Sequence, residues 1–355
     1  MNKQTHAKFN LNNFLMAFSS ALDNTVANNI NDVKYSSKAF AYIALKLANE
    51  LNISSEYKSD IFSYSIISKN QIFNNNLQYI PFNNKSFLDD NNCSICINIA
   101  SYIISNLKLQ DNTIINEIEL KNTINTNDTV TDELKQAFKK ISQKESFWYD
   151  LTSNQLGFLV FKMLEDFTIE INFDDLIQFT AVVHDSIYDY TNRNYKDDCI
   201  DFKAYGIANF FKFEPKDKAR FIIASHLINI GYLFMPLDIV NKKDILHHTE
   251  YQILKQVPYY TNYILQQVYG FNDIATLCSS VYETIDANGY PNKLGGSSLS
   301  LKQRALSVIN IYQALSEKRS YRKEFNKVEI FEILNESSNH NKIDKTIVES
   351  FEDIL

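Results

Sequence analysis

Helical periodicity dominates this sequence. In the segment SSKAFAYIALKLANEL, Phe40, Ile43, Ala44, Leu47 and Leu51 recur at spacings of three and four residues, so they share one face of a helix. The same spacing is found in DELKQAFKKISQK, KAYGIANFFKF, YQILKQVPYYTNYILQQV and RALSVINIYQALSEK. Strict alternation of apolar and polar residues over more than four positions is scarce. We therefore expect an all-α fold.

The length of the chain indicates more than one domain. A chain of 355 residues exceeds the usual size of a single core. We expect a helical domain over 1–150, a second over 151–335, and a closing C-terminal helix over 336–355 that packs on the second. The segment FLMAFSSALDNTV and the helices after it have a counterpart in FTAVVHDSIYDYT and the helices that follow it, which suggests duplication of one helical unit.

Composition argues against several classes of protein. The net charge of -7 argues against a general nucleic-acid binder, because phosphate affinity comes from clustered Lys and Arg. No apolar run reaches the roughly 18 residues that span a bilayer. Four cysteines are too few for a disulfide framework in this length, so we expect a cytoplasmic protein. Cys93 and Cys96 form a CxxC, but Cys199 and Cys278 are single and distant, so two small buried residues are favoured over zinc ligands.

The segment VYETIDANGYPNKLGG concentrates turn-forming residues in a chain with only 7 Gly and 5 Pro. It follows INIGYLFMPLDIVNKK and precedes RALSVINIYQALSEKRSYR. With these motifs in this order and spacing, residues from about 180 to 335 resemble the HD-GYP family, helical phosphodiesterases that hydrolyse cyclic di-GMP. The N-terminal half resembles the first half of tandem HD-type proteins, so the resemblance implies two HD-type domains. The matching positions are Gly231, Pro236, Lys242, Glu283, Asp286, Gly289, Tyr290, Pro291, Leu294, Gly295, Arg304, Arg319, Tyr321 and Arg322.

The resemblance also shows where this chain departs from the family. Members bind iron or manganese through His and Asp, and the metals lower the pKa of the attacking water. The family's ligand positions fall on residues of other kinds, which we treat as vestigial metal positions: Ile228 and Asn229 for the His-Asp pair, Val257, Val281, Tyr282 and Asn310, with a further His near Asn194. The Lys after the His-Asp pair is Tyr232, and the N-terminal copy of the pair falls on Ser68 and Lys69. We therefore predict no metal site, and we expect apolar and bulky side chains to fill the former site as packed core.

The histidines present do not restore a ligand set. His184-Asp185 lies more than a hundred residues before the GYP, whereas the family's spacing is about sixty, so we interpret it as a polar pair near a helix end. His226 would point about 200° away from the vacant pair on a helix. We expect His247 and His248 in the first turn of a helix and His6 and His340 in polar segments.

Two groups of matching residues remain. The retained GYP motif, Glu283, Asp286, Gly289, Tyr290, Pro291 and Gly295, either closes the domain by packing or contacts a partner, since GYP segments are proposed to bind GGDEF domains. The candidate anion-binding residues are Lys242, Arg304, Arg319 and Arg322. In the family the positions of Lys242, Arg319 and Arg322 approach the phosphates or brace the site. Structural ion pairs with helix carboxylates are the alternative for Arg319 and Arg322.

These observations predict a pseudoenzyme without cofactor. It would bind a partner protein, such as a GGDEF-type domain, a second copy of itself as a homodimer, or a cyclic dinucleotide, and would not act on nucleic acid or a membrane. The alternative is a metal-dependent cyclic di-GMP phosphodiesterase with non-standard ligands. A DNA-binding regulator with a helix-turn-helix is a third possibility. The end KVEIFEILNESSNHNKIDKTIVESFEDIL is acidic, however, and we do not expect it to contain such a DNA-recognition motif.

Overall fold

The computed structural model describes residues 6–26, 36–68, 80–111, 113–191, 200–319 and 322–355. The chain forms two compact units, one comprising residues 10–169 and the other comprising 1–9 with 170–355. Lys69, Asn194, Cys199 and Tyr321, all considered above, lie outside the described residues. Among those described, no helix is long and apolar enough to cross a membrane.

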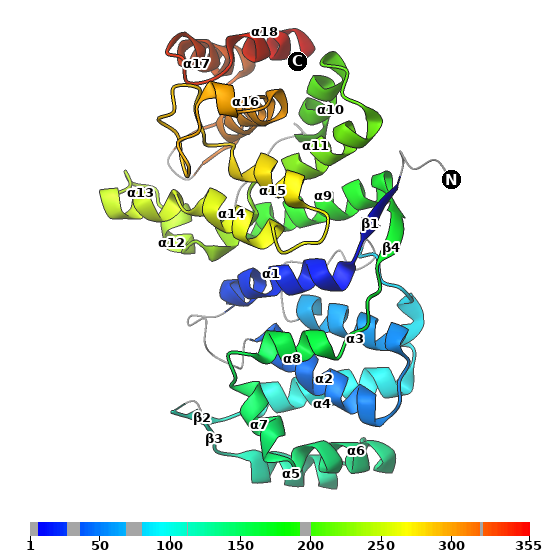
Figure 1. Cartoon of the computed structure of the whole chain (residues 1–355). Helices are drawn as coiled ribbons and strands as arrows, with labels where there is room; N and C mark the ends of the chain where they lie inside the picture. Colours follow the sequence, from blue (N-terminus) through cyan, green and yellow to red (C-terminus); the bar gives the residue numbers. More distant parts are fainter. Residues whose placement is uncertain (1–5, 27–35, 69–79, 112, 192–199, 320–321) are drawn as a thin grey trace. The chain divides into compact units, whose positions relative to one another are not determined.

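The expected all-α class is confirmed in both units (Figure 1). The unit of residues 10–169 contains α1 (Leu11–Val26), α2 (Ser37–Glu50), α3 (Ser55–Ser68), the 3-10 helix η4 (Lys85–Leu88), α4 (Asn91–Asn106), α5 (Glu117–Thr126), α6 (Asp132–Ser142), α7 (Glu145–Leu151) and α8 (Leu156–Lys162). A short hairpin of β2 (Leu109–Gln110) and β3 (Thr113–Ile114) joins α4 to α5.

Helix α2 is the centre of this unit, because it packs against α1, α3, α4, α6 and α8. Its face of Phe40, Ile43, Ala44 and Leu47 is buried, as the periodicity predicts, and Ser36 caps its N-terminus by accepting from the backbone N–H of Ala39. Because α2 has neighbours on nearly every side, its hydrophobic residues pack against all of these helices and form the centre of the core of this unit.

The CxxC lies at the start of α4. Cys93 and Cys96 are both buried, and burial raises the pKa of each thiol to about 12. Such thiols carry almost no thiolate at neutral pH, which fits the expected role as small core residues.

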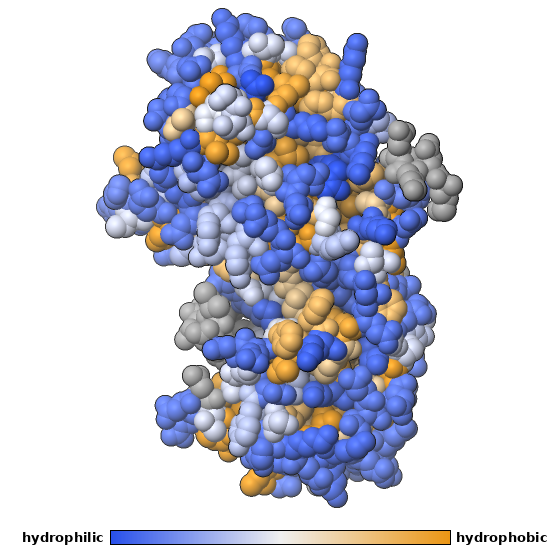
Figure 2. Space-filling model, viewed as in Figure 1, coloured by the Kyte–Doolittle hydropathy of each residue, from blue (hydrophilic) through white to orange (hydrophobic). Residues whose placement is uncertain are grey.

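The second unit begins with β4 (Ile169–Asn172) and continues with α9 (Phe173–Tyr190), α10 (Ile200–Phe210), α11 (Pro215–Leu227), the 3-10 helix η5 (Ile230–Phe234), α12 (Leu237–Val240), α13 (His248–Leu254), α14 (Val257–Leu265), α15 (Asn272–Ser279), the 3-10 helix η6 (Gly296–Ser298), α16 (Leu301–Ser316), α17 (Lys327–Asn339) and α18 (Lys345–Ile354). Helix α11 packs against α9, α10, α15 and α16, and α18 packs against α10, α16 and α17. On the face shown in Figure 2, hydrophilic residues predominate and apolar side chains are confined to patches.

The N-terminal strand belongs to this second unit, although the sequence placed residues 1–150 together. Strand β1 (His6–Phe9) pairs with β4, and the ring of Phe9 lies 5.7 Å from that of Phe179 and 6.1 Å from that of Phe271. Phe9 is fully buried there, so burial of one aromatic side chain accounts for the attachment of the strand. The polar segment expected around His6 is therefore part of a strand.

Candidate functional site

The first two vestigial metal positions lie where α11 ends. Ile228 is fully buried and Asn229 is 4% exposed, and η5 follows directly. The hydroxyl of Thr261 on α14 accepts the backbone N–H of Gly231 at 3.1 Å and donates to the carbonyl of Ile228 at 3.3 Å. A Cβ at Gly231 would lie 2.1 Å from the carbonyl oxygen of Val257, so only glycine allows η5 to approach α14 this closely. Ile228 and Val257 are therefore part of the packed core.

Val281 is also buried, at 3% exposed, but it and the three remaining vestigial positions border open space, so the expectation that the whole site is filled was wrong. Asn229, Val281, Tyr282 and Asn310 line a cavity of about 460 Å³. The reason is the direction of the Tyr282 ring, which stacks on Tyr290 at 5.1 Å, with 13° between the planes. Stacked in this way, the Tyr282 ring leaves open space beside the amides of Asn229 and Asn310.

Phenol and amide groups, together with the charged side chains of Glu283, Arg319 and Arg322, form the polar lining of this cavity, which we call the central cavity. The hydroxyl of Tyr232 lies 3.5 Å from that of Tyr282, and the amide of Asn229 donates to the hydroxyl of Tyr188 at 3.4 Å. Tyr188, Tyr232, Tyr282, Asn229 and Asn310 all line the space. These groups both donate and accept hydrogen bonds, and none carries a charge at neutral pH.

The retained GYP motif is held by a buried carboxylate. Glu283 is 3% exposed and accepts the backbone N–H of Asn292 at 2.6 Å and that of Leu294 at 2.8 Å. A Cβ at Gly289 would lie 2.5 Å from the Cα of Glu283, so this position also needs glycine. The peptide bond between Tyr290 and Pro291 is cis. Contacts within the loop therefore explain why Glu283 and Gly289 are present, and no partner protein is needed to explain them.

Not every residue of the motif has such a role. A Cβ at Gly295 would meet Ala287 at 3.5 Å, an ordinary contact, so space does not require glycine there. Asp286 accepts hydrogen bonds from Thr284 and from the backbone N–H of Asn288. These bonds, that from Thr284 first, lower the pKa of Asp286 to about 2, so this half-buried carboxylate is ionised throughout the neutral range.

Each candidate anion-binding residue has a partner within the chain. Lys242 binds Glu250 at 2.7 Å, Arg304 binds Asp344 at 2.6 Å, and Arg319 binds Glu317 at 2.7 Å. Arg322 donates to the carbonyls of Leu315 at 3.1 Å, Glu317 at 3.3 Å and Lys323 at 3.0 Å, and also to that of Ala314. Arg322 therefore covers the carbonyl end of α16, where a cation complements the helix dipole.

Arg319 and Tyr232 connect the central cavity to a second one. Both residues line the central cavity, and both also line a cavity of about 510 Å³. This second space, which we call the basic cavity, is also lined by Lys242, Lys243 and Lys318, and Asp244 is the acidic side chain among the described residues that line it. The two cavities together join uncharged polar groups to a cationic region.

A buried polar network that the sequence did not predict holds Arg319. The side chains of Lys203 and Glu317 are fully buried, and that of Gln313 is 2% exposed. Lys203 donates to Gln313 Oε1 at 3.1 Å, and Gln313 Nε2 donates to Glu317 Oε1 at 3.2 Å. A lysine on the apolar face of KAYGIANFFKF was the only signal for this network in the sequence.

His184 on α9 and His226 on α11 lie near each other. Their ring centroids are 5.9 Å apart, and both side chains are buried. His226 bonds to Thr180 Oγ1 at 2.9 Å and, through Nε2, to Asp201, while His184 Nδ1 lies 3.3 Å from Asp185. Burial lowers the pKa of His184. In the described part of the chain, no three or more His, Cys, Asp or Glu side chains are grouped to hold a metal ion.

Comparisons with known proteins show which proteins this chain is similar to. Residues 187–347 match the family model of the HD domain. The chain is 27% identical over 119 residues to the 3'3'-cGAMP-specific phosphodiesterase 1 of Vibrio cholerae, covering 34% of this chain and 28% of that protein. It is 31% identical over 99 residues to the 3'3'-cGAMP-specific phosphodiesterase 3 of the same organism, covering 28% of this chain and 22% of that protein. It is 28% identical over 123 residues to the cyclic di-GMP phosphodiesterase PdeB of Borreliella burgdorferi, covering 34% of this chain and 32% of that protein.

Residues 187–347 are therefore an HD domain, homologous to those of HD-GYP phosphodiesterases. The matched segments cover less than a third of the length of these curated relatives. A solved structure of a cyclic GMP-AMP-specific phosphodiesterase of V. cholerae matches with a TM-score of 0.53 and 14% identity, over 98% of each chain. The likeness in fold thus extends over both units.

Proposed function

We propose that this chain is a non-catalytic relative of the HD-GYP phosphodiesterases that binds a cyclic dinucleotide without hydrolysing it and passes the signal to a partner protein. The observation that carries the proposal is the chemistry of the six vestigial positions, which present hydrocarbon, amide and phenol groups. Ile228 and Val257 are moreover packed in the core. The residues present do not fit the metal centre of the family, because they offer neither imidazole nor carboxylate.

The two cavities support binding. A cyclic dinucleotide has bases with hydrogen-bonding edges and two phosphates. The phenols and amides of the central cavity suit the bases, and Arg319 with the lysines of the basic cavity suits the phosphates. Since Lys242 and Arg319 already have carboxylate partners, a phosphate would compete with Glu250 and Glu317, which favours reversible binding of moderate affinity.

One observation favours the alternative, an active phosphodiesterase with non-standard ligands. His184 and His226 lie in the same unit as the vestigial positions, with Asp185 and Asp201 in contact with them. If these side chains rearranged around a metal, hydrolysis would depend on His184. The proposal of a non-catalytic protein predicts no such dependence.

Calorimetry of the full chain with cyclic di-GMP and with 3'3'-cGAMP, with and without chelator, tests the proposal. We expect chelator-insensitive binding, no linear product, and loss of affinity in Arg319→Met but not in Lys327→Met, a matched variant of an exposed cation outside both cavities. Linear product that requires added iron or manganese and disappears in His184→Ala would support the alternative. Absence of binding to either nucleotide would contradict the nucleotide part of the proposal.

A further inference from the structure

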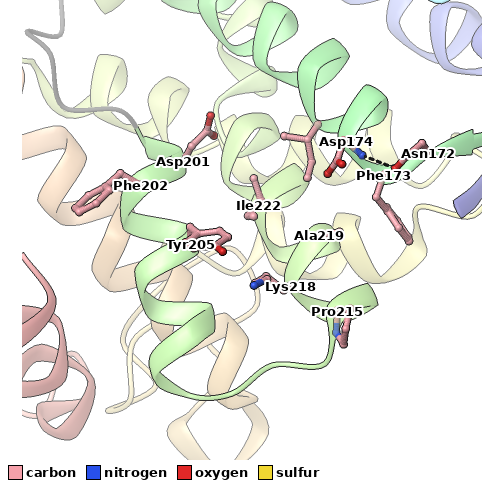
Figure 3. A pocket seen from close by; sticks show the side chains of 11 residues that line it. Asn172, Phe173, Asp174, Asp201, Phe202, Tyr205, Pro215, Lys218, Ala219 and Ile222 are labelled. Carbon is pink, nitrogen blue, oxygen red and sulfur yellow. Dashed lines mark hydrogen bonds between the residues drawn. The ribbon is translucent and has the colours of Figure 1, made fainter. Parts of the chain in front are cut away.

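A third cavity, of about 690 Å³, lies elsewhere in the second unit (Figure 3). Helix α11 packs against both α9 and α10 and forms its floor through Ala219 and Ile222, which are one helical turn apart. Phe173 and Ile177 form one wall and Tyr205 the other. The cavity has no lining residue in common with the central and basic cavities, so what it binds does not depend on the function proposed above.

The size and composition of this cavity suit a small molecule. Ligand sites usually have volumes of roughly 300–1,000 Å³, with mostly apolar walls and a few polar groups that orient the ligand. Ala219 contributes to the volume of the cavity, because its short side chain occupies little of the space between Phe173, Ile177 and Tyr205. The polar groups therefore decide which class of ligand the cavity takes.

Among the residues that the structure describes, three charged side chains line the cavity: Asp174, Asp201 and Lys218. The carboxylate of Asp201 is engaged by the Nε2 of His226. Lys218 donates to the neutral amide of Asn209 at 2.8 Å and lies 4.3 Å from the centre of the Tyr205 ring. Within the described residues, neither Asp174 nor Lys218 has an oppositely charged partner within 4.0 Å. One exposed carboxylate and one half-buried ammonium thus line the same cavity from different helices, α9 and α11, without an ion pair among the described residues (Figure 3).

We propose that this cavity binds a small zwitterion with an apolar body, such as a short apolar peptide with free ends. The ammonium of the ligand would pair with Asp174, its carboxylate with Lys218, and its apolar side chains would lie on Ile177, Ala219 and Ile222. A ligand with a single charge would form only one of the two ion pairs, each of which contributes up to about 1 kcal/mol, or about fivefold in affinity, at such a partly exposed site. The opposed pair of charges therefore selects for a molecule that carries both.

Four forms of one dipeptide test this proposal: Phe-Phe, N-acetyl-Phe-Phe, Phe-Phe amide and the doubly blocked form. They share an apolar body and differ only in charge. In calorimetry with the full chain, we expect Phe-Phe to bind best, with a loss of about fivefold for each blocked end, as for a partly exposed ion pair. Equal affinity for all four forms, or no binding of Phe-Phe, would overturn the proposal.

Charge-specific variants locate the site. Asp174→Asn should remove the discrimination between Phe-Phe and its N-acetyl form, and Lys218→Met the discrimination between Phe-Phe and its amide. Asp175→Asn and Lys216→Met are matched controls, because these exposed neighbours on the same helices do not line the cavity. Ala219→Trp fills the floor and should abolish binding of all forms. Unchanged binding in Ala219→Trp would place the dipeptide elsewhere and refute the assignment.

Discussion

Replacing Glu283 with Gln tests whether the GYP loop is retained for packing. The two carboxylate oxygens of Glu283 each accept one backbone N–H, from Asn292 at 2.6 Å and from Leu294 at 2.8 Å. Gln has the same shape but only one acceptor oxygen, so its NH₂ group would face one of the two N–H donors. A hydrogen bond to a charged group contributes about 1.5–3 kcal/mol, so local stability should fall by about 3 kcal/mol.

Hydrogen exchange of the segment 283–296 measures this change directly. A loss of about 3 kcal/mol corresponds to exchange about a hundredfold faster at the amides of Asn292 and Leu294. Glu349→Gln is the control, because its carboxylate is exposed and has only a distant lysine partner, 3.9 Å away. Unchanged exchange in Glu283→Gln would refute the packing account and favour a role for this residue in recognition.

Three further results are expected. Gly231→Ala should destabilise the second unit by about 1–3 kcal/mol in thermal unfolding, because the new Cβ would overlap the carbonyl of Val257, whereas Gly157→Ala, with an ordinary 3.5 Å contact, should not destabilise. Burial raises the pKa of Asp23 from 3.8 to about 6, so the folded state binds more protons between these values and the first unit should lose stability as pH rises through them. Asp23→Asn should remove this dependence of the free energy of unfolding on pH. If the dependence persists in the variant, Asp23 is not its cause. Arg319→Lys should weaken cyclic di-GMP binding less than Arg319→Met, as titration calorimetry would show, because a point charge remains.

The helical class and the buried face of α2 follow from local periodicity, and the sequence predicted both. The N-terminal strand could not be predicted, since four residues carry too little pattern and their attachment depends on one buried ring, Phe9. The core positions of Ile228 and Val257 agree with the expected refilling. The central cavity was missed because the direction of the Tyr282 ring depends on stacking against Tyr290, which composition does not reveal.

The same limit applies to the charges. The resemblance to the HD-GYP family singled out Arg319 and Arg322, but their partners come from contacts that form only in the fold. The buried Lys203 and Gln313 support Arg319 from residues that match no motif. Partner choice among charged groups depends on burial and geometry, which periodicity does not encode.

The metal content of the purified full chain, measured after incubation with iron or manganese under reducing conditions, tests the central claim most directly. With hydrocarbon, amide and phenol groups at the six vestigial positions, we predict no stoichiometric metal after desalting. Stoichiometric iron or manganese that is lost when Asn229→Ala or Asn310→Ala is introduced, but kept in Lys327→Met, would contradict the claim by placing a metal centre where we find packed core, amide and phenol groups.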